Sequence, residues 1–182
     1  MALTAKKWRI IDLINWGNDH FTNKGIDNAR REMEWFLCEI LNCKRIDLYI
    51  RFEEIIHKTE LDLFRKMVKR RISGEPFQYI IGKGTFYGRD FIVNESVLIP
   101  RPETEILIQC LKLNGKVKSL LDIGTGSGCI AITVLLENLA SSVYATDNSV
   151  FAINTTKENI KLYNTDKIQI QKHDFLNEKF KK

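Results

Sequence analysis

The chain has 182 residues, of which 44% are hydrophobic and 28% charged, and it carries a formal net charge of +5. This length allows one or two globular domains, and the composition, free of low-complexity tracts, excludes a chain that is disordered throughout. No stretch approaches the roughly 18 apolar residues of a membrane span, and the N-terminus lacks a signal-peptide pattern, so we expect a cytoplasmic protein without membrane contact.

The first part of the chain, residues 1–74, shows apolar residues at helical spacing in three stretches. These stretches predict helices over residues 4–20, 26–42 and 59–72. Thr4 and Thr59 stand where N-caps of the first and third helices belong, and Gly74 stands where the third should end. The pattern predicts a small helical bundle as the first domain, over residues 1–74.

The densest basic cluster of the chain falls on the third predicted helix and consists of Arg65, Lys66, Lys69, Arg70 and Arg71. Such a cluster could steer the protein to RNA or to a partner associated with a ribonucleoprotein. A solvated helix face is the reading we favour, because no aromatic residues interleave with the cluster to stack bases. We therefore expect no direct binding of nucleic acid.

The periodicity changes after Pro76. Short runs of strand type, separated by glycines, occupy residues 78–81, 85–87 and 91–93. They predict a β-hairpin linker over residues 75–102. Pro100 and Pro102 disfavour helix in the residues before them, so Ile99 and Arg101 should be extended.

The remainder, residues 103–182, alternates between the two kinds of element. Helices are expected over residues 103–113, 129–139 and 150–163, and strands over residues 117–123, 143–147 and 168–174. Strands separated by helices imply βαβ crossovers and a parallel sheet. The fold class predicted is therefore α/β, with an incomplete Rossmann-like domain that holds the first three strands of its sheet.

A glycine-rich loop follows the first of these strands, with the sequence Leu-Asp-Ile-Gly-Thr-Gly-Ser-Gly over residues 121–128. Glycine permits the positive φ angles of a tight turn, and the following helix N-terminus offers free N–H groups. A P-loop would need Gly-Lys-Ser/Thr, and the dinucleotide fingerprint would need glycine at Cys129. An acidic residue, Asp122, two places before Gly-x-Gly-x-Gly suits S-adenosylmethionine, whose methionine part carries an ammonium group.

Further acidic residues follow the next two strands. Asp147 stands 23 residues after Gly124, close to the offset of about 20 residues at which a carboxylate accepts ribose hydroxyls. Asp174 could accept from an adenine amino group while the Phe175 ring flanks the base. The candidate cofactor-binding residues are therefore Asp122, Gly124, Thr125, Gly126, Ser127, Gly128, Asp147, Asp174 and Phe175.

Each part of this site has a plainer alternative. The glycine loop could be a simple strand-to-helix turn, Asp147 could cap the helix near Val150, and Asp174 could be an ordinary loop residue. All three features nevertheless fall at the carboxyl ends of strands, where ligands bind in open α/β sheets. We expect no metal site, because the four cysteines and three histidines show no zinc-finger spacing.

Three stretches resemble the HemK-type family, the N5-glutamine methyltransferases of peptide chain release factors. They are Gly-Thr-Phe-Tyr-Gly at 84–88, Val-Leu-Ile-Pro-Arg-Pro-Glu-Thr-Glu at 97–105 and the glycine loop. The resemblance implies S-adenosylmethionine as the cofactor and a helical N-terminal domain that engages a release factor. It also implies that the substrate is the glutamine of a Gly-Gly-Gln loop in that release factor. It also implies that substrate is bound or the active site supported by Phe86, Pro100, Arg101, Glu103 and Thr104.

Members of this family carry an Asn-Pro-Pro-Tyr motif after the fourth strand, and this motif is absent from the 182 residues. Its Asn side chain and neighbouring carbonyl would hold the amide nitrogen of the substrate in line with the methyl group. We therefore expect the chain to end before its catalytic residues, with impaired transfer, and the strand at 117–123 to form an open edge of the sheet. A complete protein is expected to be a monomer.

Two alternatives to the methyltransferase assignment remain open. One is a non-catalytic fragment that retains binding of the cofactor or of a partner. The other is a methyltransferase that acts on amino groups of nucleic acids, whose active-site chemistry is related; the run at 99–105 and the helical front domain argue against it.

Overall fold

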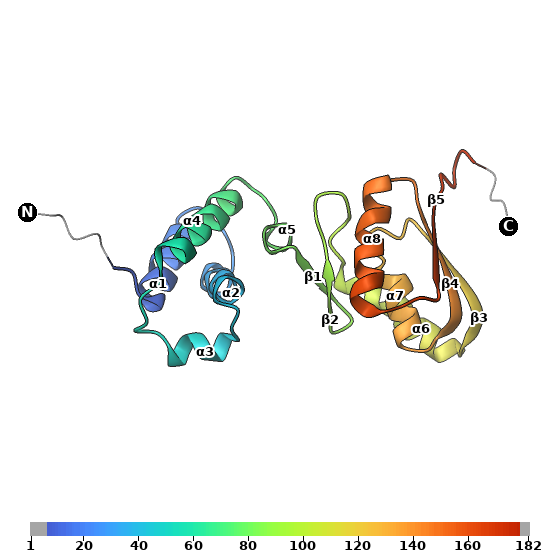
Figure 1. Ribbon diagram of the computed structural model, residues 1–182, viewed down its shortest axis with the longest axis horizontal. Coiled ribbons are helices and arrows are strands. Elements are labelled where there is room, and N and C mark those ends of the chain that lie inside the picture. Colours follow the sequence, from blue (N-terminus) through green and yellow to red (C-terminus); the bar gives the residue numbers. More distant parts are fainter. Residues whose placement is uncertain (1–6, 179–182) are drawn as a thin grey trace, which may run out of the picture. The chain divides into compact units, whose positions relative to one another are not determined.

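The computed structural model describes residues 7–178 of the chain (Figure 1). Contacts within the chain divide it into two compact units, of which the first ends at Ile81 and the second begins at Gly82. Residues 82–102 of the predicted hairpin linker therefore group with the second unit, and its first part, residues 75–81, groups with the first. Within the described residues, no helix combines the length and apolarity needed to cross a bilayer.

The first unit contains the three predicted helices, α1 (Ile10–Thr22), α2 (Ala29–Leu41) and α4 (Lys58–Ile72). Their starts differ from the prediction. Residues 7–9 precede α1 and are not helical, while Thr4 lies outside the described residues. His57, not Thr59, is the N-cap of α4, and its N–H donates to Glu60 Oε2 at 2.8 Å. Gly74 follows the end of α4 with a φ of 95°, as expected for a helix terminator.

The first unit also contains two short helices that the sequence pattern did not predict. These are α3 (Arg45–Ile50) and α5 (Phe77–Ile81), and α5 replaces the strand expected at 78–81. The N–H groups of Tyr79 and Ile80 both donate to the carbonyl of Pro76, which closes a helical turn. Phe77 and Ile80, three residues apart, then bury side chains on one face of that turn. The strand prediction was wrong because it followed the β-branched residues at 80 and 81 and overlooked the helical spacing of Phe77 and Ile80.

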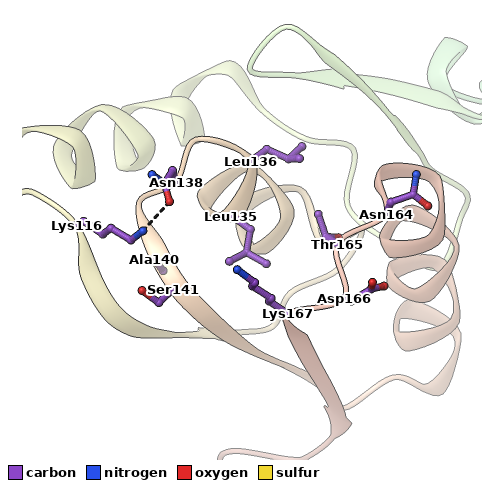
Figure 2. A pocket seen from close by; sticks show the side chains of 10 residues that line it. All are labelled: Lys116, Leu135, Leu136, Asn138, Ala140, Ser141, Asn164, Thr165, Asp166 and Lys167. Atoms are coloured by element: carbon purple, nitrogen blue, oxygen red, sulfur yellow. Dashed lines mark hydrogen bonds between the residues drawn. The ribbon is translucent and has the colours of Figure 1, made fainter.

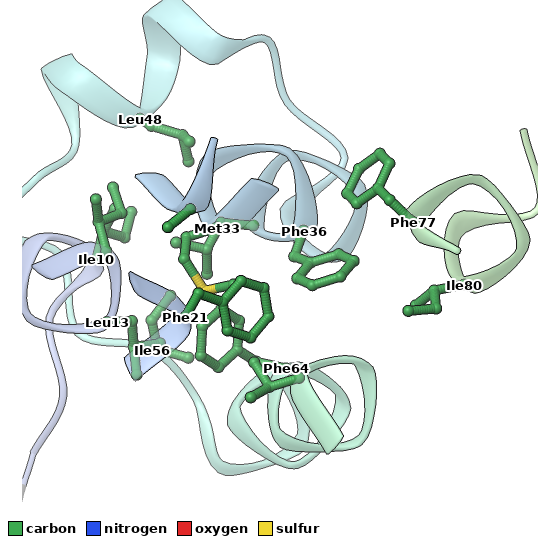
Figure 3. Close-up of a cluster of buried hydrophobic side chains, with 14 residues drawn as sticks. Ile10, Leu13, Phe21, Met33, Phe36, Leu48, Ile56, Phe64, Phe77 and Ile80 are labelled. Carbon is green, nitrogen blue, oxygen red and sulfur yellow. The ribbon is translucent and has the colours of Figure 1, made fainter. Parts of the chain in front are cut away.

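The core of the first unit is built around phenylalanines and Met33 (Figure 3). Phe21, Phe36 and Phe64 have no exposed side-chain surface. A Cβ atom at Gly17 would lie 2.1 Å from Met33 Sδ, so α1 and α2 approach each other closely only because residue 17 is glycine. These helices therefore pack around one apolar centre, as the predicted bundle requires.

The second unit begins with the predicted hairpin. Its strands, β1 (Lys83–Phe86) and β2 (Arg89–Ile92), pair antiparallel across a turn at Tyr87 and Gly88. Phe86 and Phe91 are fully buried in the core of this unit. Gly84 permits the close approach of a later segment, since a Cβ atom there would lie 3.1 Å from Pro100 Cδ.

The rest of the second unit follows the predicted alternation. A 3-10 turn (Pro102–Thr104) precedes α6 (Glu105–Asn114), and Arg101 before it is extended, as expected. The strands are β3 (Val117–Ile123), β4 (Ala140–Asp147) and β5 (Ile168–Lys172), joined by α7 (Cys129–Leu136) and α8 (Val150–Tyr163).

The sheet is parallel, with β4 between β3 and β5. This arrangement confirms the Rossmann-like α/β fold class. Helices α6, α7 and α8 lie on one side of the sheet (Figure 1). On the other face, Leu121, Ile123 and Tyr144 are 42%, 48% and 41% exposed. Within residues 7–178, β3 pairs with β4 alone, so its outer edge is open, as predicted.

Candidate cofactor site

The glycine loop joins the end of β3 to the start of α7 at the carboxyl edge of the sheet. The N–H groups of Gly124 and Thr125 donate to the carbonyl of Thr146 at 2.8 and 2.9 Å. These bonds fasten the beginning of the loop to the end of the neighbouring strand β4. The loop is therefore placed by the sheet itself and does not depend on side-chain packing alone.

The loop has an open side and a packed side. Gly124 and Gly126 have φ angles of 73° and 57°, and a Cβ atom built on either would meet no other atom within 4 Å. A Cβ atom at Gly128 would instead lie 2.7 Å from Thr156 Cγ2, against helix α8. The backbone at Gly124 and Gly126 is thus open to a ligand, and the Thr125 side chain between them is buried and bonded to Asp122, so no side chain covers this side of the loop.

Asp122 lies beneath this loop and is 8% exposed. The hydroxyl of Thr125 donates to its Oδ2 at 2.8 Å. Burial raises the pKa of the Asp122 carboxyl, an effect that the hydrogen bond from Thr125 opposes. In this arrangement Asp122 braces the loop from the inside, and its contact with a cofactor ammonium remains a prediction.

Asp147 ends β4 and faces the loop. Its Oδ2 accepts from the Gly126 N–H at 3.0 Å, and its Oδ1 accepts from the Ser149 N–H at 2.9 Å. The N-cap of α8 is Ser149, whose Oγ accepts from the Ala152 N–H, so Asp147 does not have the capping role considered above. A carboxylate has about four acceptor sites, so two further hydroxyl donors can be accommodated, as the vicinal hydroxyls of a ribose would require.

Asp174 and Phe175 follow β5, which ends at Lys172, two residues earlier than predicted. Asp174 accepts from the N–H groups of Leu176 and Asn177 and from Asn177 Nδ2. The Asn177 side chain is the main reason that the pKa of Asp174 lies below its usual value. These hydrogen bonds form a local turn, which agrees with the alternative that Asp174 is an ordinary loop residue. Phe175 is 49% exposed, so its ring is accessible, and adenine binding remains a prediction.

The end of β5 nevertheless lies beside the end of β4, because the His173 N–H donates to the carbonyl of Asp147 at 2.9 Å. The glycine loop, Asp147 and the segment at 173–175 are therefore linked by backbone or side-chain hydrogen bonds at one edge of the sheet. This is the geometry that three strand ends in parallel should produce.

The residues expected to bind substrate differ in exposure. Phe86 is fully buried and packs edge-on against Phe91, with ring centroids 6.3 Å apart, so it can support a site but offers no surface to a substrate. Pro100 is partly buried against Gly84. Arg101 and Glu103 are exposed and Thr104 is partly exposed, at the extended segment and turn before α6. Their role towards a substrate remains a prediction.

A separate hollow of about 290 Å³ lies at the opposite end of the strands (Figure 2). Lys116, Ala140 and Lys167, at the starts of the three strands, contribute to its lining, and Lys116 Nζ donates to Asn138 Oδ1 at 2.6 Å. Because the glycine loop lies at the carboxyl ends, this hollow is not part of the candidate site. In residues 7–178, no group of three or more His, Cys, Asp or Glu side chains could hold a metal ion.

Comparison with known proteins accounts for both units. Residues 12–82 match the PrmC N-terminal domain, and residues 102–182 match the methyltransferase small domain. The chain is 38% identical to a release factor glutamine methyltransferase of Geobacter sulfurreducens, over 84% of this chain and 54% of that protein. The similarity to release factor glutamine methyltransferases therefore extends over most of this chain. A relative of the same name in Chlorobaculum tepidum is 36% identical, over 96% of this chain and 63% of that protein.

The chain thus spans between one half and two thirds of the length of these two relatives. The match to a methyltransferase domain supports S-adenosylmethionine as the cofactor. Among solved structures, M. jannaschii TYW2 in complex with AdoMet is similar, with a TM-score of 0.44 and 18% identity over 52% of this chain and 44% of that one.

Two buried polar residues of α8 belong to the loop's surroundings and were not predicted. Thr156 and Asn159 are 0% exposed, and their side chains reach backbone atoms of residues 126 and 127. The only signal in the sequence was a pair of small polar residues three positions apart, at places in the helical repeat where apolar residues would be usual. That signal does not say which backbone groups they meet.

Proposed function

We propose that the chain binds S-adenosylmethionine along residues 124–128 and Asp147, as part of a protein that methylates the glutamine side-chain amide of peptide chain release factors. One observation supports the binding site above others. The open side of the glycine loop and a carboxylate with acceptor capacity to spare adjoin each other, joined by the Gly126–Asp147 hydrogen bond.

When bound, the cofactor would supply a sulfonium methyl group for in-line attack by the amide nitrogen, with S-adenosylhomocysteine as the leaving group and loss of a proton from the nitrogen. The residues of this chain would bind and orient. Asp147 would accept the two ribose hydroxyls, which fixes the nucleoside along β4. The bare backbone at Gly124 and Gly126 would allow the methionine part to lie against the loop, beside the positive end of helix α7. Positioning of this kind can lower a barrier by about 7–11 kcal/mol.

The partner and the setting complete the proposal. The relatives' name supports a release factor as the substrate protein, and the PrmC-type first unit would engage it. We further propose a cytoplasmic, monomeric protein without a nucleic-acid substrate.

The binding site can be tested by calorimetry with S-adenosylhomocysteine, using Asp147→Asn and a matched control, Asp166→Asn. Asp166 is exposed and lies at the opposite end of the strands, in the lining of the separate hollow (Figure 2). We expect the unaltered chain and Asp166→Asn to bind alike, and Asp147→Asn to bind at least about tenfold more weakly, a loss of about 1.4 kcal/mol. Absence of any heat or thermal stabilisation for the unaltered chain would refute the cofactor site.

The substrate is tested separately, by offering the chain a release factor, the same factor with its Gly-Gly-Gln glutamine changed to alanine, and duplex DNA or RNA. Transfer should be slow, because the 182 residues lack the Asn-Pro-Pro-Tyr motif. Label transfer from the cofactor to the first alone supports the proposal. Transfer to nucleic acid would favour the alternative enzyme class, and cofactor binding without any transfer would favour the non-catalytic fragment.

A further inference from the structure

Helix α8 turns polar side chains towards the core of the second unit. Thr156 and Asn159 are completely buried, although buried polar groups are tolerated only when they are hydrogen-bonded. Thr156 and Asn159 can be buried because both side chains are hydrogen-bonded. Their hydrogen bonds reach the glycine loop from its packed side.

Thr156 holds the first of two adjacent peptide groups. Its hydroxyl donates to the carbonyl of Gly126 at 2.7 Å, and also lies 3.1 Å from the carbonyl of Ala152 in its own helix. A trans peptide is planar, with its C=O and N–H on opposite sides. Since the Gly126 carbonyl points at α8, the N–H of Ser127 in the same peptide points away from α8, towards the open side of the loop.

Asn159 holds the next peptide group and a second segment as well. Its Nδ2 donates to the carbonyl of Ser127 at 2.8 Å and to the carbonyl of Ile92 at 3.0 Å, while its Oδ1 accepts from the Ile92 N–H at 2.8 Å. One buried amide therefore joins the glycine loop to the end of strand β2. The paired bonds to Ile92 also fix which way the amide faces, because the opposite orientation would set an NH2 group against an N–H.

The segment held in this way leads towards the residues proposed to bind substrate. Beyond Ile92, Asn94 Nδ2 donates to Thr155 Oγ1 at 3.0 Å, and Pro100 packs against Gly84 of the hairpin. Thr155 thus anchors the same segment to α8 but makes no bond to the glycine loop. Thr155 and Thr156 are neighbours of equal size, both buried, with different attachments.

We propose that Thr156 and Asn159 are positioning residues of the cofactor site. They set the direction of two peptide groups in the glycine loop, and Asn159 couples that loop to the segment that continues to Pro100–Thr104. This inference rests on the proposed function, because it concerns how the same site is held ready for S-adenosylmethionine.

The first experiment compares Thr156→Val, Thr155→Val and Thr156→Ser by calorimetry with S-adenosylhomocysteine, alongside their melting temperatures. Valine keeps the volume of threonine and removes the hydroxyl, and serine retains the hydroxyl. We expect Thr156→Val to bind about tenfold more weakly, Thr155→Val to bind like the unaltered chain, and Thr156→Ser to recover most of the affinity. A purely structural role would instead make affinity follow the melting temperature in all three variants.

The second experiment measures the coupling by hydrogen exchange in peptides that cover residues 89–99, with and without S-adenosylhomocysteine. We expect the ligand to slow exchange there in the unaltered chain and in Thr155→Val. In Asn159→Asp, which retains an acceptor for the Ile92 N–H but loses the amide donors, slowing should be confined to the glycine loop. If Asn159→Asp does not fold, the same exchange measurement on Asn159→Ser, which loses the paired bonds to Ile92, decides the coupling.

The outcomes separate the two proposals. If the unaltered chain does not bind S-adenosylhomocysteine, the proposed function fails and this inference fails with it. If the unaltered chain binds and Thr156→Val binds equally well, the positioning role is wrong while the cofactor site stands. Equal protection of residues 89–99 in Asn159→Asp and the unaltered chain would overturn the coupling.

Discussion

Alanine substitutions at two glycines of the loop should differ in effect: Gly128→Ala should mainly lower stability, and Gly124→Ala should mainly weaken cofactor binding. Gly124 and Gly128 both have positive φ angles, 73° and 79°, so alanine at either position costs about 1–2 kcal/mol in backbone strain. The surroundings differ. A Cβ atom at Gly124 meets nothing within 4 Å, whereas at Gly128 it would lie 2.7 Å from Thr156 Cγ2 and 3.3 Å from Ile132 Cδ1.

The contact distance of two carbon atoms is about 3.5–4.0 Å, so Gly128→Ala must displace α8 or Thr156. Overpacking of this kind costs about 1–3 kcal/mol, which brings the total for Gly128→Ala to roughly 2–5 kcal/mol. Gly124→Ala should cost about 1–2 kcal/mol. Its Cβ atom enters the open side of the loop, however, so it should weaken S-adenosylhomocysteine binding by more than its effect on stability suggests.

Urea unfolding followed by two signals checks this. All three tryptophans, Trp8, Trp16 and Trp35, lie in the first unit, so their fluorescence reports that unit, while far-UV circular dichroism reports both. With a slope of about 1–3 kcal/mol per molar urea, Gly128→Ala should lower the midpoint of the second unit by roughly 1 M or more and leave the fluorescence transition in place. Equal midpoints for the two variants would refute the steric argument.

The remaining predictions concern charge, thiols and the two units. Glu137 pairs with Lys112 and Arg89, each at 2.6 Å, and these partners lower the pKa of its carboxyl. The stability it contributes is therefore present above its unfolded pKa and is lost as the pH falls through the folded value, so Glu137→Gln should lower the urea midpoint of the second unit at pH 7 and progressively less below about pH 4. Iodoacetamide at pH 8 should label exposed Cys110 well before Cys129, whose pKa burial raises to about 11; mass spectrometry of tryptic peptides gives the order, and faster labelling of Cys129 would contradict its burial. Finally, the fluorescence and circular dichroism transitions of the unaltered chain should not coincide, with the second unit unfolding at lower urea; a single steep transition of high stability in both signals would count against independent units.

The sequence predicted those elements whose signals are local. The long amphipathic helices α2 and α4 were recognisable because their apolar residues repeat at helical spacing, and strand β3 was recognisable as a short apolar run directly before the glycine loop. Helix α3 was missed because six residues are too few to show a repeat. Helix α3 is instead stabilised by contacts with α2, since Arg45 and Tyr49 donate to the fully buried carboxylate of Glu34 at 2.6 and 2.8 Å.

The same distinction applies to the candidate site. The glycine loop and Asp147 could be recognised because each stands directly after a strand, and parallel strands bring their ends together. The contribution of Asn159 could not, because its partners Ile92 and Ser127 are 67 and 32 residues away along the chain. Which buried amide meets which backbone group is decided by the packing of α8 on the loop and the hairpin, and single-chain periodicity carries no information about that.

Among residues 7–178, no helix covers one face of the sheet, and this has a practical consequence for judging whether the chain is folded. Leu121, Ile123 and Tyr144 leave an apolar surface on that face in the native arrangement. Dyes such as ANS should adhere to it, and their fluorescence is often read as the mark of a molten globule. For this chain a bright dye signal would accompany ordered side chains, so near-ultraviolet circular dichroism is the sounder criterion when preparations or variants are compared.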